Sequence, residues 1–356
     1  MSQTPILQFE RVSKRFGATV AVDDVSVDIA PGEFFALLGP SGCGKTTLMR
    51  MAAGFEQPDE GRVLIDGADA TDAPPHRRPV NMMFQSYALF PHMSVADNIA
   101  FGLKAAGFSR EALAARVSEM VRLAQLQGLE KRKPHQLSGG QKQRTALARS
   151  LARGTKLLLL DEPLGALDRK LREETQFELM DIQKRLGAAF VVVTHDQDEA
   201  MSMADRIAVM RAGKIEQVGA PADIYERPRS RYVAEFIGEI NIFAGRASRA
   251  GEMLRIEAQD GEIEAPARDG VGDGAPLACA VRPERIRFAP AGEEGANRLA
   301  GVVHDVAYRG DHRVFRVRLK SGALARVAAP SALPAPQPGE AATLVFDTAA
   351  CVVLDA

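Results

Sequence analysis

The chain is constrained most by residues 39–46, which read Gly-Pro-Ser-Gly-Cys-Gly-Lys-Thr and match the pattern G-x-x-x-x-G-K-[ST]. An apolar run at 34–38 predicts a buried strand directly before this loop, and a helix is expected directly after it. Glycines allow successive backbone N–H groups to face inward, and the positive end of the following helix points at the same place. The loop therefore predicts a phosphate-binding site.

Two side chains at the end of this loop have specific tasks in such a site. Lys45 is expected to reach the β- and γ-phosphates of a nucleotide, and the Thr46 hydroxyl is expected to ligate Mg²⁺. The alternative is a glycine-rich turn with a coincidental Lys-Thr pair. The strand and the helix on either side of the loop favour nucleotide binding. Cys43 is expected to be a small filler inside the loop.

Three more apolar runs, 80–84, 157–160 and 190–193, predict buried strands of a largely parallel α/β sheet. Polar side chains follow directly after each of these runs, namely Gln85, Asp161 with Glu162, and Thr194 with His195. Ligands of open α/β sheets bind beyond the carboxyl ends of the strands. The polar residues at these strand ends therefore predict one convergent site that includes the loop.

The chemistry of these residues suggests separate roles. Asp161 suits holding Mg²⁺, and Glu162 suits polarising the attacking water as general base, although such a pair alone would more often cap a surface helix. His195 is expected to hydrogen-bond the γ-phosphate or the water, against the alternative of a structural histidine. Gln85 is expected to order water or Mg²⁺, against the alternative of an ordinary loop glutamine.

A second glycine motif, Leu137-Ser-Gly-Gly-Gln141, opens another predicted helix with Ser138 as its N-cap. It is a second helix N-terminus stripped of side chains, which predicts a second anion-binding site. Because one triphosphate needs only one such site, we expect this one to bind the nucleotide of another copy, in a dimer with ATP at its interface. A simple capped turn is the alternative.

Composition sets broader bounds. The length of 356 residues suggests about two domains. The 45 Lys and Arg against 46 Asp and Glu leave a net charge of −1, so no basic field favours nucleic acid as the main partner. The three cysteines fit neither a disulfide framework nor a metal site. No signal peptide or membrane-spanning run is evident, which predicts a cytoplasmic chain with any membrane role supplied by a partner.

The pattern changes after about residue 240. Apolar and charged residues alternate at 254–257 and 315–320, and turns are expected at Asp260-Gly261 and Ser321-Gly322. These features predict hairpins with one solvated face. The last third is therefore expected to be a small all-β domain, a barrel in our interpretation.

Together these motifs resemble the ATP-binding subunits of ABC transporters over nearly the whole chain. Residues 39–46 resemble the Walker A loop, 158–162 the Walker B strand, 137–141 the family signature, Ala166-Leu167-Asp168 the D-loop, Gln85 the Q-loop and His195 the switch histidine. Phe16 lies where the family places an aromatic ring under adenine. The resemblance implies an α/β P-loop NTPase cassette with a mostly parallel sheet and a helical subdomain at 1–238, followed by a small all-β OB-like (TOBE) regulatory domain at 239–356.

The resemblance also implies an ATP hydrolase with ATP and Mg²⁺ as cofactors. Catalytic roles would belong to Glu162, His195 and Gln85, and Mg²⁺ contacts to Thr46, Gln85 and Asp161. The implied nucleotide-binding residues are Phe16, Gly39, Pro40, Ser41, Gly42, Cys43, Gly44, Lys45, Thr46, Thr47, Ser138, Gly139, Gly140, Gln141 and Asp168. They would act in a head-to-tail homodimer that sandwiches two ATP molecules.

The implied partners are two integral-membrane permease subunits and, through the complex, a solute-binding protein, at the cytoplasmic face of the inner membrane. The segment after Gln85 would dock the permeases through its apolar side chains, Tyr87, Leu89, Phe90, Met93 and Phe101. Residues 281–284, Val-Arg-Pro-Glu, resemble the regulatory domain of importer ATPases for polyamines, ferric iron, maltose and sulfate. Residues 236–241 and 307–310 are most similar to the spermidine/putrescine branch.

Other functions remain as alternatives. The same motor role for ferric iron, a maltose-type sugar or sulfate is one. A soluble ABC ATPase of DNA repair or of translation is another. Repair ATPases insert long coiled coils between the Walker motifs, whereas Lys45 and Asp161 are only 116 residues apart here, and translation proteins carry two cassettes in one chain. Both features favour the importer motor.

Overall fold

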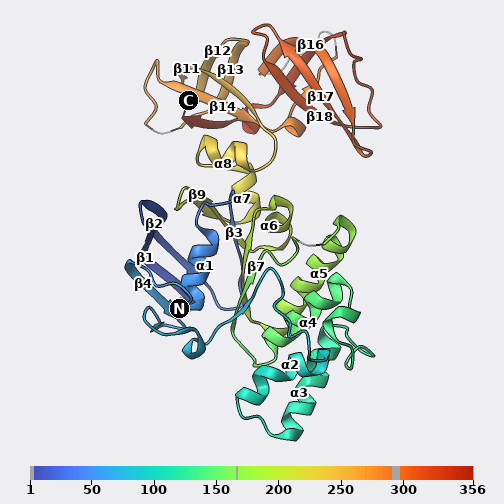
Figure 1. Cartoon of the computed structure of the whole chain (residues 1–356). Helices are drawn as coiled ribbons and strands as arrows, with labels where there is room; N and C mark the ends of the chain where they lie inside the picture. The colour runs from blue at the N-terminus through green and yellow to red at the C-terminus, as the bar shows by residue number, and fades with distance from the viewer. Residues whose placement is uncertain (1–3, 166, 269, 291–296, 356) are drawn as a thin grey trace. The chain divides into compact units, whose positions relative to one another are not determined.

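The computed structural model describes residues 4–165, 167–268, 270–290 and 297–355, and the chain forms two compact units, 1–221 and 222–356 (Figure 1). The elements of the first unit are β1 (Leu7–Phe16), β2 (Thr19–Ile29), β3 (Phe34–Leu38), α1 (Lys45–Ala53), β4 (Glu60–Ile65), β5 (Ala68–Asp69), β6 (Asn81–Met83), α2 (Val95–Ala105), α3 (Arg110–Leu123), α4 (Gly139–Leu151), β7 (Leu157–Asp161), α5 (Arg169–Leu186), β8 (Ala189–Thr194), α6 (Gln197–Met203), β9 (Arg206–Arg211) and β10 (Lys214–Gly219).

The main sheet of the first unit has the strand order β10-β9-β3-β8-β7-β6. All neighbours pair in parallel except β10, which runs antiparallel to β9. Every residue of β3 and β8 is buried, as expected for parallel strands covered on both faces. The mostly parallel α/β sheet is thereby confirmed, although the run at 80–84 forms only the three-residue β6.

A second, antiparallel sheet of the first unit has the order β2-β1-β4-β5. Helix α1 lies between the two sheets (Figure 1). Its buried side chains, Leu48, Met49 and Met51, share one core with apolar residues of both sheets. This packing holds the N-terminal end of α1 next to the carboxyl end of β3.

Side-chain caps mark the starts of three further helices. Ser109 caps α3, Ser138 caps α4 and Asp168 caps α5, each by accepting a hydrogen bond from a backbone N–H of the first turn. Helix α5 ends at Gly187 in a left-handed conformation with φ 60°, which glycine adopts readily. Within the described ranges, no helix is long and apolar enough to cross a membrane.

The second unit contains two five-stranded antiparallel sheets, β13-β12-β11-β14-β20 and β15-β19-β16-β17-β18. Its elements are α7 (Pro221–Glu226), α8 (Arg231–Phe236), β11 (Asn241–Ala250), β12 (Met253–Ala258), β13 (Gly261–Pro266), β14 (Pro276–Val281), β15 (Arg287–Phe288), β16 (Asn297–Tyr308), β17 (His312–Leu319), β18 (Leu324–Pro330), β19 (Ala341–Phe346) and β20 (Val352–Asp355). The expected hairpins are the pairs β12–β13 and β17–β18.

The all-β character of this unit is confirmed, but its strands pair as two sheets over one core rather than as the single barrel we expected. Alternating apolar residues specify which face of each strand is buried. They do not specify which strands pair, because pairing depends on contacts between distant segments.

Helices α7 and α8 pack on the β-strands of the second unit. The buried Arg282 side chain donates hydrogen bonds to the carbonyl groups of Tyr225, Ala234 and Glu239 and so ties both helices to the end of β14. The compact units accordingly divide between Pro221 and Ala222. The domain boundary between 238 and 239 stays a prediction, and it lies where the β-strands begin.

Candidate nucleotide-binding and hydrolysis site

The loop between β3 and α1 needs its glycines for steric reasons. Gly44 caps α1 in a left-handed conformation with φ 106°. A Cβ atom at this position would lie 2.2 Å from the carbonyl oxygen of Ala21, closer than any real contact. A side chain is therefore excluded where the backbone turns into the helix.

The loop places Lys45 as the expected phosphate-binding cation. Its side chain is only 6% exposed, and Nζ donates hydrogen bonds to the carbonyl oxygens of Gly39 at 2.7 Å and Pro40 at 2.9 Å. The rim of the loop, Pro40 to Gly42, is exposed. A buried ammonium group under an exposed rim of backbone amides suits an incoming anion.

The remaining residues of the loop surround this cation. Cys43 is buried, with its Sγ 3.7 Å from Lys45 Nζ, and it fills space inside the loop as expected. Thr46 and Thr47 are half-buried in the first turn of α1.

The structure brings together three of the predicted residues from separate strand ends. Glu162 Oε1 lies 3.0 Å from His195 Nδ1, and Gln85 Nε2 donates a hydrogen bond to Glu162 Oε2 at 2.8 Å. Glu162 follows β7, His195 follows β8 and Gln85 follows β6. The Glu162 carboxylate is thus held between two polar side chains at the carboxyl edge of the sheet.

The backbone at Glu162 is strained. Its φ is 45°, in the left-handed region that non-glycine residues rarely adopt. Its amide donates to the carbonyl of Val193 at 2.9 Å, so β8 holds the turn in place. Such strain gathers at functional sites, because the surrounding fold must stabilise it.

Asp161, the last residue of β7, carries a carboxyl group in an unfavourable environment. Burial raises its pKa, and the neighbouring Glu162 raises it further, while Arg50 and Lys45 act in the opposite direction. A cation bound beside it would relieve this cost.

The N-terminus of α4 forms the second glycine tip. Ser138 Oγ accepts from the Gln141 amide at 3.3 Å, and Gln141 Oε1 accepts from the Ser138 amide at 3.0 Å, which completes a capping box. Ser138 and Gly139 are exposed, and Gly140 is buried against Leu171 of α5. These residues do not join the Glu162 cluster within one chain.

Two other predicted contact residues lie apart from this cluster. Asp168 is exposed, and its carboxylate caps α5 by accepting from the Leu171 amide at 3.0 Å. Ala166, at the start of the predicted D-loop, lies outside the described residues. Phe16 ends β1 with 46% of its surface exposed, and Lys14 Nζ lies 5.5 Å from its ring centroid.

Sequence reasoning missed the side chains that anchor these loops. The Arg149 guanidinium, in α4, donates to the carbonyls of Ala88 at 2.7 Å and Tyr87 at 2.9 Å, and so holds the segment after Gln85. Both bound residues have positive φ angles. An arginine in a helix carries no sequence signal for such a role, since its partners are backbone atoms of a distant segment.

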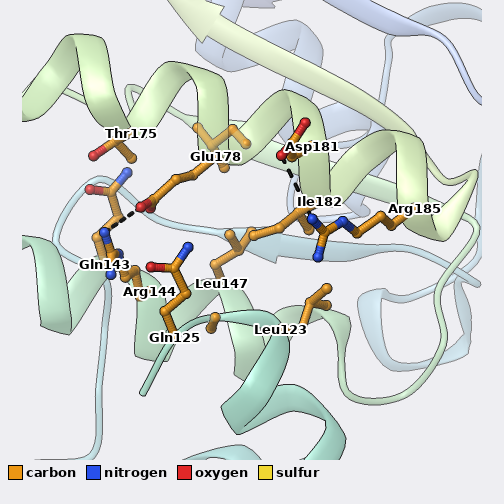
Figure 2. A pocket seen from close by; sticks show the side chains of 12 residues that line it. Leu123, Gln125, Gln143, Arg144, Leu147, Thr175, Glu178, Asp181, Ile182 and Arg185 are labelled. Atoms are coloured by element: carbon orange, nitrogen blue, oxygen red, sulfur yellow. Dashed lines mark hydrogen bonds and ion pairs between the residues drawn. The ribbon is translucent and has the colours of Figure 1, made fainter. Parts of the chain in front are cut away.

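A small cavity of about 50 Å³ separates α4 from α5 (Figure 2). Arg144 of α4 pairs with Glu178 of α5 across it. Gln143 beside them is 1% exposed, and neither its amide nitrogen nor its amide oxygen has a hydrogen-bond partner among the described residues. The contact between these two helices is therefore incompletely satisfied.

Comparisons with known proteins agree with this geometry. Residues 22–165 match the family model described as ABC transporter, and residues 279–354 match the model described as TOBE domain. The dimeric, post-hydrolysis structure of the ATP-binding cassette MJ0796 bound to ADP and Pi is 31% identical, covers 60% of this chain and 98% of its own, and superimposes with a TM-score of 0.54.

Two curated relatives match along nearly their full lengths. The putrescine transport ATP-binding protein PotG of Escherichia coli (strain K12) is 50% identical over 99% of this chain and 95% of its own. The spermidine/putrescine import ATP-binding protein PotA of Nitrosospira multiformis is 49% identical over 92% of each chain. This chain belongs to the ABC transporter family, among the ATP-binding proteins of the putrescine and spermidine/putrescine group.

Proposed function

We propose that this chain is the ATP-binding and ATP-hydrolysing subunit that energises an importer of polyamines such as spermidine and putrescine. The observation that carries the hydrolytic part is the Glu162 carboxylate, held between Gln85 and His195 at the same sheet edge as the Lys45 loop. The names of the relatives support polyamines as the imported solute.

The chain's own groups suffice to describe the hydrolytic step. Backbone amides of the loop and the Lys45 ammonium bind the β- and γ-phosphates of ATP. The Glu162 carboxylate accepts a proton from the attacking water, whose oxygen bonds to the γ-phosphorus while the bond from that phosphorus to the oxygen of the leaving ADP breaks. His195 holds that carboxylate and contacts the γ-phosphate. The hydrogen bond from Gln85 to Glu162 makes this arrangement depend on the segment that begins at Gln85.

The residues present fit a bound Mg²⁺. Asp161 offers a carboxylate whose pKa is raised by burial. Thr46 in the first turn of α1, and Gln85, which is bonded to the neighbouring Glu162, offer neutral oxygen atoms. Mg²⁺ commonly uses one or two such protein ligands together with phosphate oxygens and water. When bound, the ion neutralises charge on the phosphates.

The active form is proposed to be a homodimer, in which the Ser138–Gly140 tip, exposed at Ser138 and Gly139, and Asp168 of one copy contact ATP held by the Lys45 loop of the other. The dimeric structure of the related cassette supports this arrangement. Glu162→Gln with ATP and Mg²⁺ should therefore run as a dimer in size-exclusion chromatography with light scattering. A monomer at concentrations where the wild type hydrolyses ATP would contradict the arrangement.

The partners are proposed to be two permease subunits and a solute-binding protein that reaches this chain through them, at the cytoplasmic face of the inner membrane. The candidate docking segment follows Gln85. The ring centroids of Phe90 and Phe101 lie 4.4 Å apart, and Phe101 is 44% exposed. Tyr87, in contrast, is buried and belongs to the core. The proposed function involves no nucleic acid partner.

Uptake assays test the proposal. Cells of the source organism that lack this gene should lose uptake of radiolabelled putrescine or spermidine, and plasmid-borne wild type should restore it. Lys45→Ala should not restore it, because productive ATP binding is lost, while Lys184→Gln, an exposed charge removal on α5, should.

If cells that lack this gene keep polyamine uptake but lose uptake of ferric iron, maltose or sulfate, the chain energises the importer of that solute instead. Unchanged uptake of all four, with sensitivity to DNA damage or a translation defect, would favour the soluble ABC ATPases.

A further inference from the structure

Arg172, one turn inside α5, contacts two loops that flank the candidate site. Its Nη2 donates a hydrogen bond to the carbonyl of Leu167 at 3.2 Å, and its Nη1 pairs with Asp196 Oδ2 at 2.6 Å. Leu167 precedes α5, and Asp196 follows β8. One planar guanidinium thus joins two segments far apart in the sequence, a task that its fixed fork of donors suits.

Asp196 is itself built into the loop that carries His195. Its Oδ1 caps α6 by accepting from the amides of Asp198 at 2.9 Å and Glu199 at 3.3 Å. Its own amide donates to Thr194 Oγ1 at 3.0 Å. His195 lies between these two anchored residues, so a shift of the Asp196 carboxylate moves the imidazole that contacts Glu162.

A second carboxylate lies close to Arg172. Glu199 is 2% exposed and accepts a hydrogen bond from Thr194 Oγ1 at 2.7 Å, while its other oxygen lies 3.9 Å from Arg172 Nε. Nε is buried and has no hydrogen-bond partner among the residues that the structure describes. Arg172 is therefore bonded to the Asp196 carboxylate, and the Glu199 carboxylate lies just beyond hydrogen-bond distance. A small shift of the guanidinium would exchange the first partner for the second.

We propose that Arg172 is a positioning residue for ATP hydrolysis, which couples the Leu167–Asp168 segment to the His195–Glu162 pair. In the dimer a partner copy contacts Asp168, and displacement of the Leu167 carbonyl shifts the guanidinium between Asp196 and Glu199. The His195–Glu162 pair, already in contact at 3.0 Å within one chain, is then positioned on the bound ATP only when the partner is in place. The inference rests on the proposed function, since it assigns a control of that same site.

The direct test is Arg172→Gln in the full chain, assayed with ATP and Mg²⁺. We expect kcat to fall ~10-fold to 10²-fold, the usual effect of a misplaced catalytic group, with the affinity for a fluorescent ATP analogue within about twofold of wild type. Lys184→Gln removes a charge from an exposed position of the same helix and should leave both unchanged.

Asp196→Asn approaches the coupling from its other end. Asparagine caps a helix as well as aspartate does, so α6 is kept while the ion pair is lost. We expect it to lower kcat as Arg172→Gln does, and the double variant to be no slower than the slower single variant. Multiplying effects in the double variant would show that the two residues do not act as one unit.

Arg172→Lys keeps the charge but not the fork, and serves if Arg172→Gln does not fold. We expect Arg172→Lys to have a lower kcat than wild type and the same melting temperature. The inference fails if wild type hydrolyses ATP and the Arg172 and Asp196 variants have the same kcat as wild type. It also fails if every loss of hydrolysis is explained by a loss of affinity for ATP. Absence of hydrolysis by wild type would instead contradict the proposed function.

Discussion

Each unit contains a buried cationic side chain that donates hydrogen bonds to backbone carbonyls, but the two sets of carbonyls differ in their exposure and position. Lys45 in the first unit is 6% exposed and binds carbonyls of a loop whose rim is open to solvent. Arg282 in the second is 4% exposed and binds carbonyls at the ends of α7 and α8. Both are charged and hydrogen-bonded. The difference is that the partners of Lys45 belong to one loop with an exposed rim, whereas the partners of Arg282 belong to two helices and the segment that follows them.

One buried side-chain amide from each unit shows a second difference. In the second unit, Asn297 accepts from the Glu264 amide at 2.6 Å and donates to the Glu264 carbonyl at 2.9 Å, which satisfies both ends. In the first, both ends of Gln143 lack a partner among the described residues. The unpartnered amide of Gln143 in α4 and the buried carboxyl group of Asp161, whose pKa is raised, are positions where the first unit gives up stability.

The largest expected effect is on the rate of ATP hydrolysis, which should depend on a glutamate of the first unit and not on one of the second. Glu162→Gln should lower kcat by ~10²–10⁴-fold, the usual contribution of a general base, with ATP binding retained. The same change at the exposed Glu257 of β12 should leave kcat unchanged. Steady-state hydrolysis and equilibrium ATP binding give the answer. Near-normal turnover of Glu162→Gln would assign the base to another residue.

The next effect concerns stability in the second unit. Arg282→Leu leaves three carbonyl groups, one of them fully buried, without their donor, and we expect it to lower the free energy of unfolding of that unit by about 3–5 kcal/mol. Arg285→Leu, which removes only an exposed ion pair with Glu226, should leave the stability nearly unchanged. Urea denaturation measures both, and equal losses would remove the special role of Arg282.

A pair of amide substitutions tests the contrast directly. Gln143→Met replaces two unpartnered polar atoms by an apolar side chain of similar length, and should raise the stability of the first unit by about 1 kcal/mol. Asn297→Leu orphans two backbone groups of Glu264 and should lower the stability of the second unit by about 1–3 kcal/mol. Thermal melts that move in the same direction for both variants would refute the comparison.

The smallest effect is pH-dependent. Burial raises the pKa of Asp161 above its usual value, so the folded chain binds this proton more tightly than the unfolded chain does. The contribution of Asp161 to stability therefore falls as pH rises from about 3.9 through the raised pKa. Asp161→Asn lacks this loss and should be more stable at neutral pH by less than about 1 kcal/mol, since the half-buried group is partly screened.

Denaturation curves at several pH values check this prediction, and a constant difference between Asp161→Asn and wild type would contradict it. The same variant should lose Mg²⁺-dependent hydrolysis. Gaining stability while losing activity is the expected sign of a group kept for function.

The site could be predicted residue by residue where local geometry decides it. The loop at 39–46 needs glycines for its own backbone, and Ser138 and Asp168 cap helices that begin at the next residue. The meeting of Gln85, Glu162 and His195 followed from the strand ends alone, because parallel strands end at one edge. Their individual roles in catalysis stay predictions.

Tertiary structure decided what depends on distant contacts. The sequence alone determined the phosphate loop, the cap at Ser138 and the hairpin turns, because each is set by a few consecutive residues. Only the folded chain paired the second unit's strands as two sheets and brought Arg172 to Asp196, Arg149 to the segment after Gln85, and Arg282 to two helix ends. A long arginine side chain binds whatever carbonyl or carboxylate the packing brings to it, and no local pattern encodes that neighbour.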